Sequence, residues 1–536
     1  MGTEVIQNGN THNIIGGTRP GGGGNLFHSF GEFGVPTDNI ANFLNEAELP
    51  TSNILSRVTG GNPSNIFGTI QTEGFGNANL FLMNPAGIVF GPDASLNIGG
   101  STHFTTSDYL KLGDGVQFTA LPSAQDTVLS VAPVVAFGFL GSNPASLMVG
   151  HSTLSVGEGE ALSLIGGDID ISGGTLKSQD GQINLVSLNS PGSVSLSEDG
   201  GLQVKATQLG QIYLTSDASV SVDGESGGII VVRGGNLMME GSQISANATG
   251  SSELAMVGVS GYGIDIEVSE DVVLDKRSKV VADVSGLRDG KNIRVMASGI
   301  LEIRNSILRS LAAPGSTGNA GNIEVHAENV LFNIDERGSG FDILGISSQA
   351  VGAAGDSGSI KINTNSFQML GGFIATVTFG FPTAGGIVGG TGKVGSIELT
   401  VANDISIIGG FGGGNIVANA IFASGNAGDV LIHANNLRLT GDSAIQAVTA
   451  LGPGDAGAIK IILKGNLDVQ EASQIGSFSQ GGGDAGDITI IAKDIFLTGV
   501  ADPTPDGTPS GNQTLITAAL QQNLWVTSGS GRAPSV

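Results

Sequence analysis

The chain has 536 residues, with 88 glycines, no cysteine and a formal net charge of −26. This charge argues against nucleic acid and anionic membrane surfaces as partners, because both are bound through clustered Lys and Arg. The absence of cysteine excludes thiol catalysis, disulfides and cysteine-based metal sites. Apolar residues make up 40% of the chain and charged residues 13%, which with the glycine content favours many short strands and tight turns.

The N-terminal residues MGTEVIQNGN lack a basic segment followed by an apolar run, so they are not a signal peptide. If the protein is exported, we expect its signal to have been removed or to lie upstream. Twelve of the 22 phenylalanines lie at or before residue 139, and none lies in 140–331. Four of these rings are expected to close the open N-terminal end of a narrow core: Phe27, Phe30, Phe33 and Phe43.

Residues 79–100, NLFLMNPAGIVFGPDASLNIGG, contain three short pairs of alternating apolar residues. Each pair predicts one short strand, so the segment is predicted to be one coil of three strands. The intervening NPAG has turn residues, because Pro85 presets φ and Gly87 tolerates positive φ. Asp suits such a turn as well as Asn does. The sequence alone therefore predicts that Asn84→Asp leaves the stability of the fold near wild type.

From residue 318 onward one phrase recurs, as in GNAGDVLIHANNLRLTG and GDAGAIKIILKGNLDVQ. Its second glycine falls at 321, 358, 395, 428, 457 and 486, at spacings of 37, 37, 33, 29 and 29 residues. Such a period indicates stacked repeats. Each unit contains three alternating apolar pairs separated by turn residues. The first-strand anchors can be followed back to give twelve: 162, 183, 212, 230, 264, 293, 323, 360, 397, 430, 459 and 488.

Three short strands per unit predict an all-β fold, a right-handed parallel β-helix with an N-terminal cap and coils about 4.8 Å apart. Leucine-rich repeats need another spacing, and propeller blades need a fourth strand. We expect a monomeric rod with three parts. These are an N-terminal part with the cap and first coils (1–150), a β-helix repeat region (151–500) and a tail that opens with Pro503, Pro505 and Pro509 and holds the only tryptophan (501–536).

Carboxylates on one strand face are the best candidates for an enzymatic or calcium site. Asp168 and Asp170 alternate with isoleucines in GGDIDISGG, and Asp265 and Glu267 repeat the arrangement. Polar-out alternation is the default for a half-buried strand, so we interpret both pairs as solvated faces. The Gly-Asp-Ala-Gly turns lack the tandem nine-residue repeat of calcium-binding arrays, and the six histidines show no metal spacing. We therefore expect no catalytic residue, metal or cofactor.

Three stretches in the first hundred residues together resemble the two-partner secretion domain of the filamentous haemagglutinin family, in its cyanobacterial branch. They are GGGGNLFHSFGEFGVP (21–36), ILSRVTGGNPSNIFGTI (54–70) and NLFLMNPAGIVFGPDASLNIGG (79–100). The family motif Asn-Pro-Asn-Gly-Ile is matched at four of five positions, with Ala86 as the departure. The family's Asn-Pro-Ser turn is also present, whereas its Asn-Pro-Asn-Leu motif is absent.

The resemblance implies export to the periplasm and passage through an outer-membrane Omp85-type transporter. The POTRA domains of that transporter bind the secretion domain in a non-native, extended state, and the passenger folds outside the cell. The protein is then a secreted or surface-exposed, adhesin-like exoprotein, with host or surface glycans or proteins as further partners. The matched residues are those expected to contact the transporter: Asn62, Pro63, Asn84, Pro85, Gly87 and Ile88.

Two alternatives stay open at this point. A β-helix carbohydrate-active enzyme, a lyase or hydrolase, would need a carboxylate cluster across adjacent coils. The stalk of a contact-dependent toxin would need a toxin domain, and the tail has no compact, charged segment of that kind.

Overall fold

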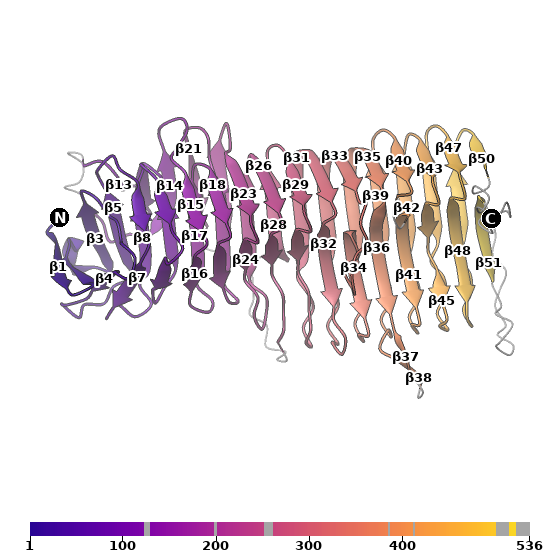
Figure 1. The fold of residues 1–536 in the computed structure, drawn as a ribbon, viewed down its shortest axis with the longest axis horizontal. Helices are drawn as coiled ribbons and strands as arrows, with labels where there is room; N and C mark the ends of the chain where they lie inside the picture. Colours follow the sequence, from indigo (N-terminus) through magenta and orange to yellow (C-terminus); the bar gives the residue numbers. More distant parts are fainter. Residues whose placement is uncertain are drawn as a thin grey trace.

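The computed structural model describes residues 1–122, 129–197, 201–250, 261–383, 386–410, 413–499 and 514–520. These residues form one long rod along which the chain winds from the N-terminal end (Figure 1). Each turn of the chain is a coil with three faces, and strands from successive coils pair in parallel on each face. The fold is thus the predicted parallel β-helix with three strands per coil. Within these residues, no helix of the length and apolarity needed to cross a membrane is found.

The first face is made by the first strand of each coil. Its strands are β3 (Asn25–Phe30), β5 (Asn53–Val58), β8 (Asn79–Met83), β11 (Thr102–Thr105), β17 (Ala161–Gly166), β20 (Gln182–Ser187), β25 (Ile229–Gly234), β28 (Tyr262–Val268), β31 (Asn292–Arg304), β33 (Ile323–Asn333), β35 (Ile360–Leu370), β39 (Ile397–Val401), β42 (Val430–Ala434), β46 (Ile459–Leu463) and β49 (Ile488–Ile491).

The second face includes the C-terminal parts of the long strands β31, β33 and β35, which continue around the corner. Its other strands are β6 (Ser64–Ile66), β9 (Ile88–Phe90), β15 (Leu147–Gly150), β18 (Ile169–Ser172), β23 (Gln211–Thr215), β26 (Asn236–Glu240), β29 (Val272–Asp275), β40 (Ile405–Ile408), β43 (Leu437–Thr440), β47 (Leu467–Gln470) and β50 (Ile495–Thr498).

The third face consists of two sheets. The N-terminal one contains β1 (Thr3–Asn8), β2 (Thr11–Gly16), β4 (Ile40–Leu44), β7 (Thr69–Glu73) and β10 (Ser95–Asn97). The longer one contains β16 (Thr153–Val156), β19 (Thr175–Ser178), β24 (Ser219–Ser221), β27 (Gln243–Ser245), β30 (Lys279–Val281), β32 (Ile307–Ala312), β34 (Gly345–Val351), β36 (Gly372–Phe379), β41 (Gly414–Ile421), β44 (Ala444–Gln446), β45 (Thr449–Ala450), β48 (Gln474–Gln480) and β51 (Leu515–Leu520).

Three further elements project from the coils. An outer antiparallel sheet contains β12 (Tyr109–Leu112), β13 (Gln117–Thr119), β14 (Val134–Phe139), β21 (Gly192–Leu196) and β22 (Leu202–Ala206). A hairpin of β37 (Phe381–Thr383) and β38 (Gly386–Val388) extends from the third face, and a 3-10 turn, η1 (Pro20–Gly22), precedes β3. Of the predicted tail 501–536, only residues 514–520, which include β51, are among the described residues; Trp525 and the prolines lie outside them.

The register of the first face confirms the predicted anchors, with one exception. Leu162 pairs with Ile183, and Val430 pairs with Ile459. Ile212 does not belong to this series, because it pairs with Ile169 on the second face. The insertion of β21 and β22 places this second strand 29 residues after Ile183. That distance equals the length of a whole later coil, which is why the sequence pattern misassigned it. Residues 79–100 form the predicted single coil, as β8, β9 and β10.

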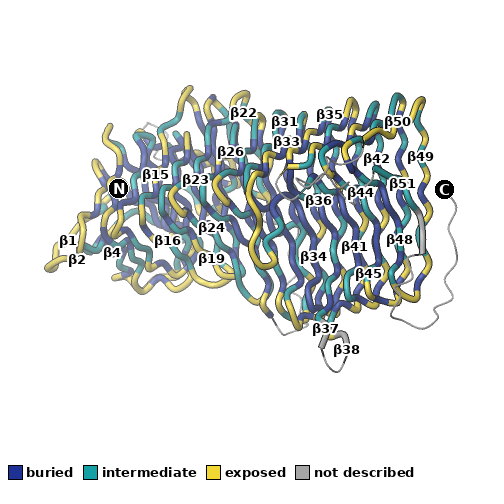
Figure 2. The backbone as a smooth tube through the Cα atoms, turned by 45° about the vertical axis from the view of Figure 1, so that its right-hand side comes forward, coloured by how far each residue is buried: buried dark blue, intermediate teal, exposed yellow. Residues whose placement is uncertain are grey.

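One continuous core runs the length of the rod, from Ile14 to Ile488. Buried residues follow the strands, and exposed residues gather at the corners (Figure 2). At the N-terminal end Phe30, Phe33 and Phe43 fill this core as predicted, with the rings of Phe30 and Phe33 at 5.1 Å between centroids. The antiparallel pair β1–β2 closes the third face there.

A second core lies outside the coils and corrects the prediction for Phe27. On the N-terminal coils, outward positions of the first face are apolar, and Phe27, Leu55 and Phe81 stack in register. The outer sheet covers them, and the ring of Phe118 packs edge-on against Phe27 at 5.0 Å between centroids. Because side chains alternate along a strand, Phe27 points away from the core that Leu26 enters. It does not help to close the end of the coil.

The glycines of the repeated phrase allow adjacent coils to approach closely. A Cβ atom on Gly358 would lie 2.2 Å from the carbonyl oxygen of Gly321, and one on Gly395 would lie 2.2 Å from that of Gly358. Neither glycine has a positive φ. Space, not backbone conformation, therefore requires glycine at these corners.

Between the glycines, amide and carboxylate side chains join one coil to the next. The Asn319 Oδ1 atom accepts the N–H of Asp356 at 2.7 Å, and the Asp356 Oδ1 atom accepts the N–H of Lys393 at 2.6 Å. The Asp455 Oδ1 atom accepts the N–H of Asp484 at 2.8 Å in the same way. The Gly-Asp-Ala-Gly segments are thus corners whose carboxylates satisfy backbone donors.

Outward positions of the first face alternate in charge along the rod, and this corrects one prediction. Asp265, Arg294, Glu324, Lys361 and Glu398 follow one another in register. Asp265 is only 8% exposed and lies 2.7 Å from the Arg294 Nε atom, so the solvated face predicted for it is wrong. Stacked like charges repel one another, and the alternation avoids this repulsion while favouring one register.

Replacing Gly358 by Ala tests the close approach at the corners. The added Cβ overlaps a backbone carbonyl that cannot move independently, and we expect a loss of about 1–3 kcal/mol in the free energy of unfolding. Gly482 is the matched control, because its Cβ would have Pro453 Cα at 4.0 Å as its nearest neighbour. Thermal unfolding followed by circular dichroism should show a lower Tm for Gly358→Ala only; equal Tm values for the two variants would contradict the account.

Two histidines are buried in the N-terminal coils. His28 points into the closed end of the core, where its Nδ1 atom lies 3.2 Å from Thr3 Oγ1. His103 lies under the outer sheet, stacked on Phe81 at 4.5 Å between ring centroids and 2.9 Å from Ser163 Oγ. Burial lowers the pKa of both imidazoles from 6.5 to about 4.

Substitution of His103 by Phe should reduce the acid sensitivity of the fold. The unfolded chain takes up a proton near pH 6.5 that the folded chain binds only near pH 4. The stability contributed by a neutral buried histidine is therefore complete above pH 6.5 and is lost as the pH falls toward 4. Urea unfolding at about pH 7.5 and about pH 4 should show that wild type loses about 3 kcal/mol more than His103→Phe. Equal losses in the two proteins would contradict the prediction.

Candidate secretion-signal site

The six residues predicted to contact a transporter come together at one corner of two adjacent coils. Asn84–Gly87 forms the turn that leads from β8 to β9. The Gly87 N–H donates to the Asn84 carbonyl oxygen at 3.1 Å, and Gly87 has a φ of +113°, as the turn prediction requires. Asn62 and Pro63 lie one coil earlier, directly before β6.

The side chain of Asn84 joins these two segments. It is fully buried. Its Nδ2 atom donates to the Asn62 carbonyl oxygen at 3.1 Å and to Ser64 Oγ at 2.9 Å. Its Oδ1 atom accepts the N–H of Ala86 at 2.9 Å. The amide thus connects two coils and closes its own turn.

The other residues of the set differ in exposure. Asn62 and Pro63 are exposed, and the Asn62 Nδ2 atom donates to Glu32 Oε1 at 2.7 Å. Pro85 is half-buried. Ile88 is fully buried in the core, in register between Ser64 and Leu147. In the folded rod only part of the motif can therefore meet another protein.

Sequence reasoning did not identify Ser64 as the partner of Asn84. Ser64 is fully buried, and the hydrogen bond to Asn84 joins the third residue of the Asn-Pro-Ser turn to the first residue of the next motif. The sequence feature that could have revealed this contact is that each of the two segments comes directly before a short strand. Segments at the same place in successive coils are expected to stack, and the parallel pairing of β6 with β9 shows that these two do.

Of the two carboxylates considered for catalysis on the strand of residues 169–172 and the corner before it, one has a structural hydrogen bond. Asp168 lies at the corner before β18, where its Oδ1 atom accepts the N–H of Gln211 at 2.8 Å. Asp170 is half-buried on β18, in register with Met148 and Tyr213. The part of the chain that the structure describes contains no group of three or more His, Asp or Glu side chains suited to a metal ion.

Asn84→Asp should destabilise the rod, which replaces the expectation from sequence alone. Asp loses both N–H donors and places carboxylate oxygens beside the carbonyl oxygen of Asn62. We expect a loss of about 2–3 kcal/mol for Asn84→Asp and about 1 kcal/mol for Ser64→Ala, which removes one bond only. Urea unfolding measures both values. A wild-type free energy of unfolding for Asn84→Asp would show that the buried amide contributes nothing.

Comparison with known proteins gave two findings and one negative result. The TPS secretion domain family matches residues 1–254. The HMW1 secretion domain from Haemophilus influenzae, known from a crystal structure, is 15% identical, with a TM-score of 0.38 over 92% of this chain and 97% of that chain. No curated protein matches.

The family match begins with the capped coils and extends past the outer sheet, beyond the boundary predicted at residue 150. It includes both Asn-Pro segments. The matched family is a secretion domain and not an enzyme family. Residues 1–254 thus match the TPS secretion domain, and this match supports a two-partner secreted exoprotein.

Proposed function

We propose that residues 1–254 direct the chain to an outer-membrane Omp85-type transporter, whose POTRA domains contact the two Asn-Pro segments before they fold. The observation that carries this proposal is the complete burial of Asn84 within a matched secretion domain. A buried amide with three hydrogen bonds can be contacted by a partner only while the coil is open. Recognition and folding therefore compete for the same side chain.

The geometry of the rod also favours folding during export. Each coil pairs with its immediate neighbours, so contacts form in the order in which the chain emerges. Folding of the first coils outside the cell would bury Asn84 and Ile88 and release them from the transporter. The completed rod then acts as an adhesin-like surface protein. We further propose the division at residues 150 and 500 as the boundaries of the N-terminal part and the repeat region.

Secretion of Asn84→Ala and Ser64→Ala through the partner transporter tests recognition separately from stability. Both substitutions remove the hydrogen bond between residues 84 and 64, but only the first removes a side chain that the transporter would contact. We expect Asn84→Ala to lower the amount of secreted protein about tenfold, as the loss of about 1.4 kcal/mol of binding would. Ser64→Ala should be secreted near the wild-type level.

The free energy of unfolding of each purified variant is the control. If secretion of the two variants falls in proportion to their stability, then the transporter does not contact the Asn84 side chain. Secretion of Asn84→Ala at the wild-type level would contradict the proposal as well.

A further inference from the structure

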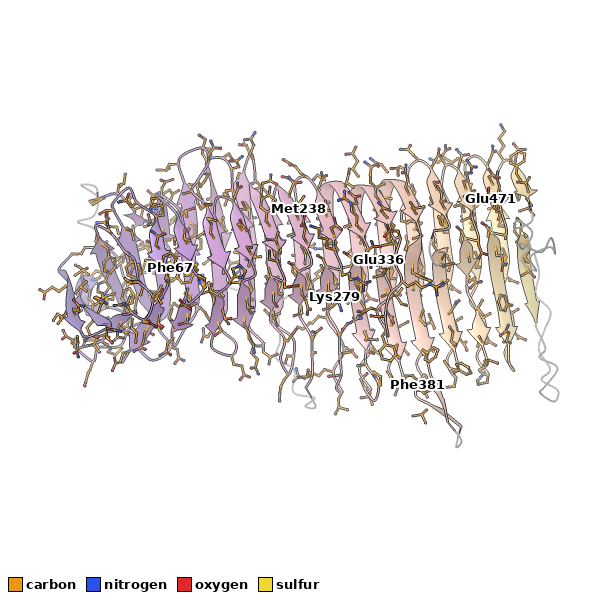
Figure 3. All side chains as sticks on the ribbon, in the orientation of Figure 1. Phe67, Met238, Lys279, Glu336, Phe381 and Glu471 are labelled. Atoms are coloured by element: carbon orange, nitrogen blue, oxygen red, sulfur yellow. The ribbon has the colours of Figure 1, made fainter. Side chains whose placement is uncertain are left out.

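A groove lies on the third face, far along the chain from residues 1–254. It has a volume of about 460 Å³ over β34, β36 and β41. The loop before β34 borders it through Gly340, Phe341 and Ile343. The ring of Phe341 lies 6.4 Å, between centroids, from that of Phe381 at the start of the β37–β38 hairpin. Figure 3 shows Phe381 where this hairpin leaves the rod.

The lining of the groove combines apolar side chains with amides. Phe373, Phe379 and Val417 are among the apolar residues, and Gln349 and Asn419 are among the amides. None of the residues that line the groove is charged, although the chain has a net charge of −26. The surface therefore offers rings, methyl groups and neutral hydrogen-bonding groups.

The groove continues along the rod axis into a second cavity of about 460 Å³. Asn415 and Gln446 line both cavities, and the second is also lined by Gln474 and by one charged pair of opposite sign, Arg337 and Asp442. These amides come from β41, β44 and β48, which pair in succession on the third face. Each of three successive coils thus contributes one side-chain amide, but the amides are staggered: Asn415 and Gln474 share a register position with an alanine between them, and Gln446 lies two residues further along its strand.

Three classes of ligand fit this surface poorly. A hydrocarbon chain would cover the Gln446 amide without offering it a hydrogen bond, which is costly. A polyanion would find no cation in the first cavity, one arginine beside an aspartate in the second, and an acidic protein around both. A peptide strand needs an open sheet edge, whereas the floor strand β36 is paired with β34 on one side and β41 on the other.

We infer that this groove binds a neutral oligosaccharide. Sugar rings present apolar C–H faces that pack on Phe373 and Phe379, and hydroxyl groups that both donate and accept hydrogen bonds, as the amide of Gln446 does. A chain of sugar units placed along the rod axis meets one amide from each of three successive coils, staggered by two residues. A neutral oligosaccharide would be the ligand for the adhesin-like surface role proposed above, on which this assignment rests.

Calorimetric titration of the purified, folded chain tests the inference without the transporter, so its failure would leave the secretion proposal untouched. The probes are neutral gluco-, manno-, galacto- and xylo-oligosaccharides, with oligogalacturonate and dodecanoate as the charged and hydrocarbon comparisons. We expect a neutral oligosaccharide to bind, and Phe379→Ala and Gln446→Ala each to weaken its binding about tenfold. The matched controls are Phe496→Ala and Gln368→Ala, exposed residues of the second face, which should bind as wild type does.

Every other result overturns the inference. These results are the absence of binding by all neutral probes, tighter binding of oligogalacturonate or dodecanoate, and equal affinity in the groove variants and their controls. Thermal unfolding of each variant shows that a loss of binding is not a loss of fold. Gln446→Ala is the safer variant in this respect, because its side chain is half-exposed and outside the core.

Discussion

The structure depends on one constraint, the stacking of coils in register at the spacing of hydrogen-bonded strands, about 4.8 Å. At that distance every residue lies on its counterpart in the next coil. Glycine is required where two corners meet, since a Cβ on Gly358 would lie 2.2 Å from a carbonyl oxygen. Side-chain oxygens replace the missing backbone partners between these glycines. Charges of alternating sign prevent repulsion along the outside of the first face.

The same constraint connects the fold to the proposed export signal. In the stacked coils the side-chain amide of Asn84 is already hydrogen-bonded. Its Nδ2 atom donates to the coil before it, and its Oδ1 atom accepts a backbone N–H of its own turn. A motif that is buried by stacking is accessible only before stacking. Under the proposed function the same segment is both a signal and a buried corner of the fold, so that completion of the fold would hide the signal.

Much of the fold follows from the sequence, because alternation and period are local properties. The coil of residues 79–100 and the anchors of the repeat region could be predicted in this way. The wrong predictions concern a coil that contains an insertion, and outward side chains that another part of the protein covers. Ile212 was misassigned because β21 and β22 place it 29 residues after Ile183, and this distance equals the length of a whole later coil. Phe27 and Asp265 were misassigned because the outer sheet and the arginines that cover them come from distant segments. The stacking of the segment before β6 on the segment before β9 was visible in the pattern, but the burial of the Asn84 amide was not.

The most direct test of the central claim compares two states of the same chain on immobilised POTRA domains of the partner transporter. One sample is the folded rod, and the other is the chain freshly diluted from urea, before it has folded. The account predicts that the freshly diluted chain binds, that binding disappears at the rate of folding, and that the folded rod does not bind. Equal binding of the folded rod would show that the transporter reads the surface of the coils, and would contradict the account.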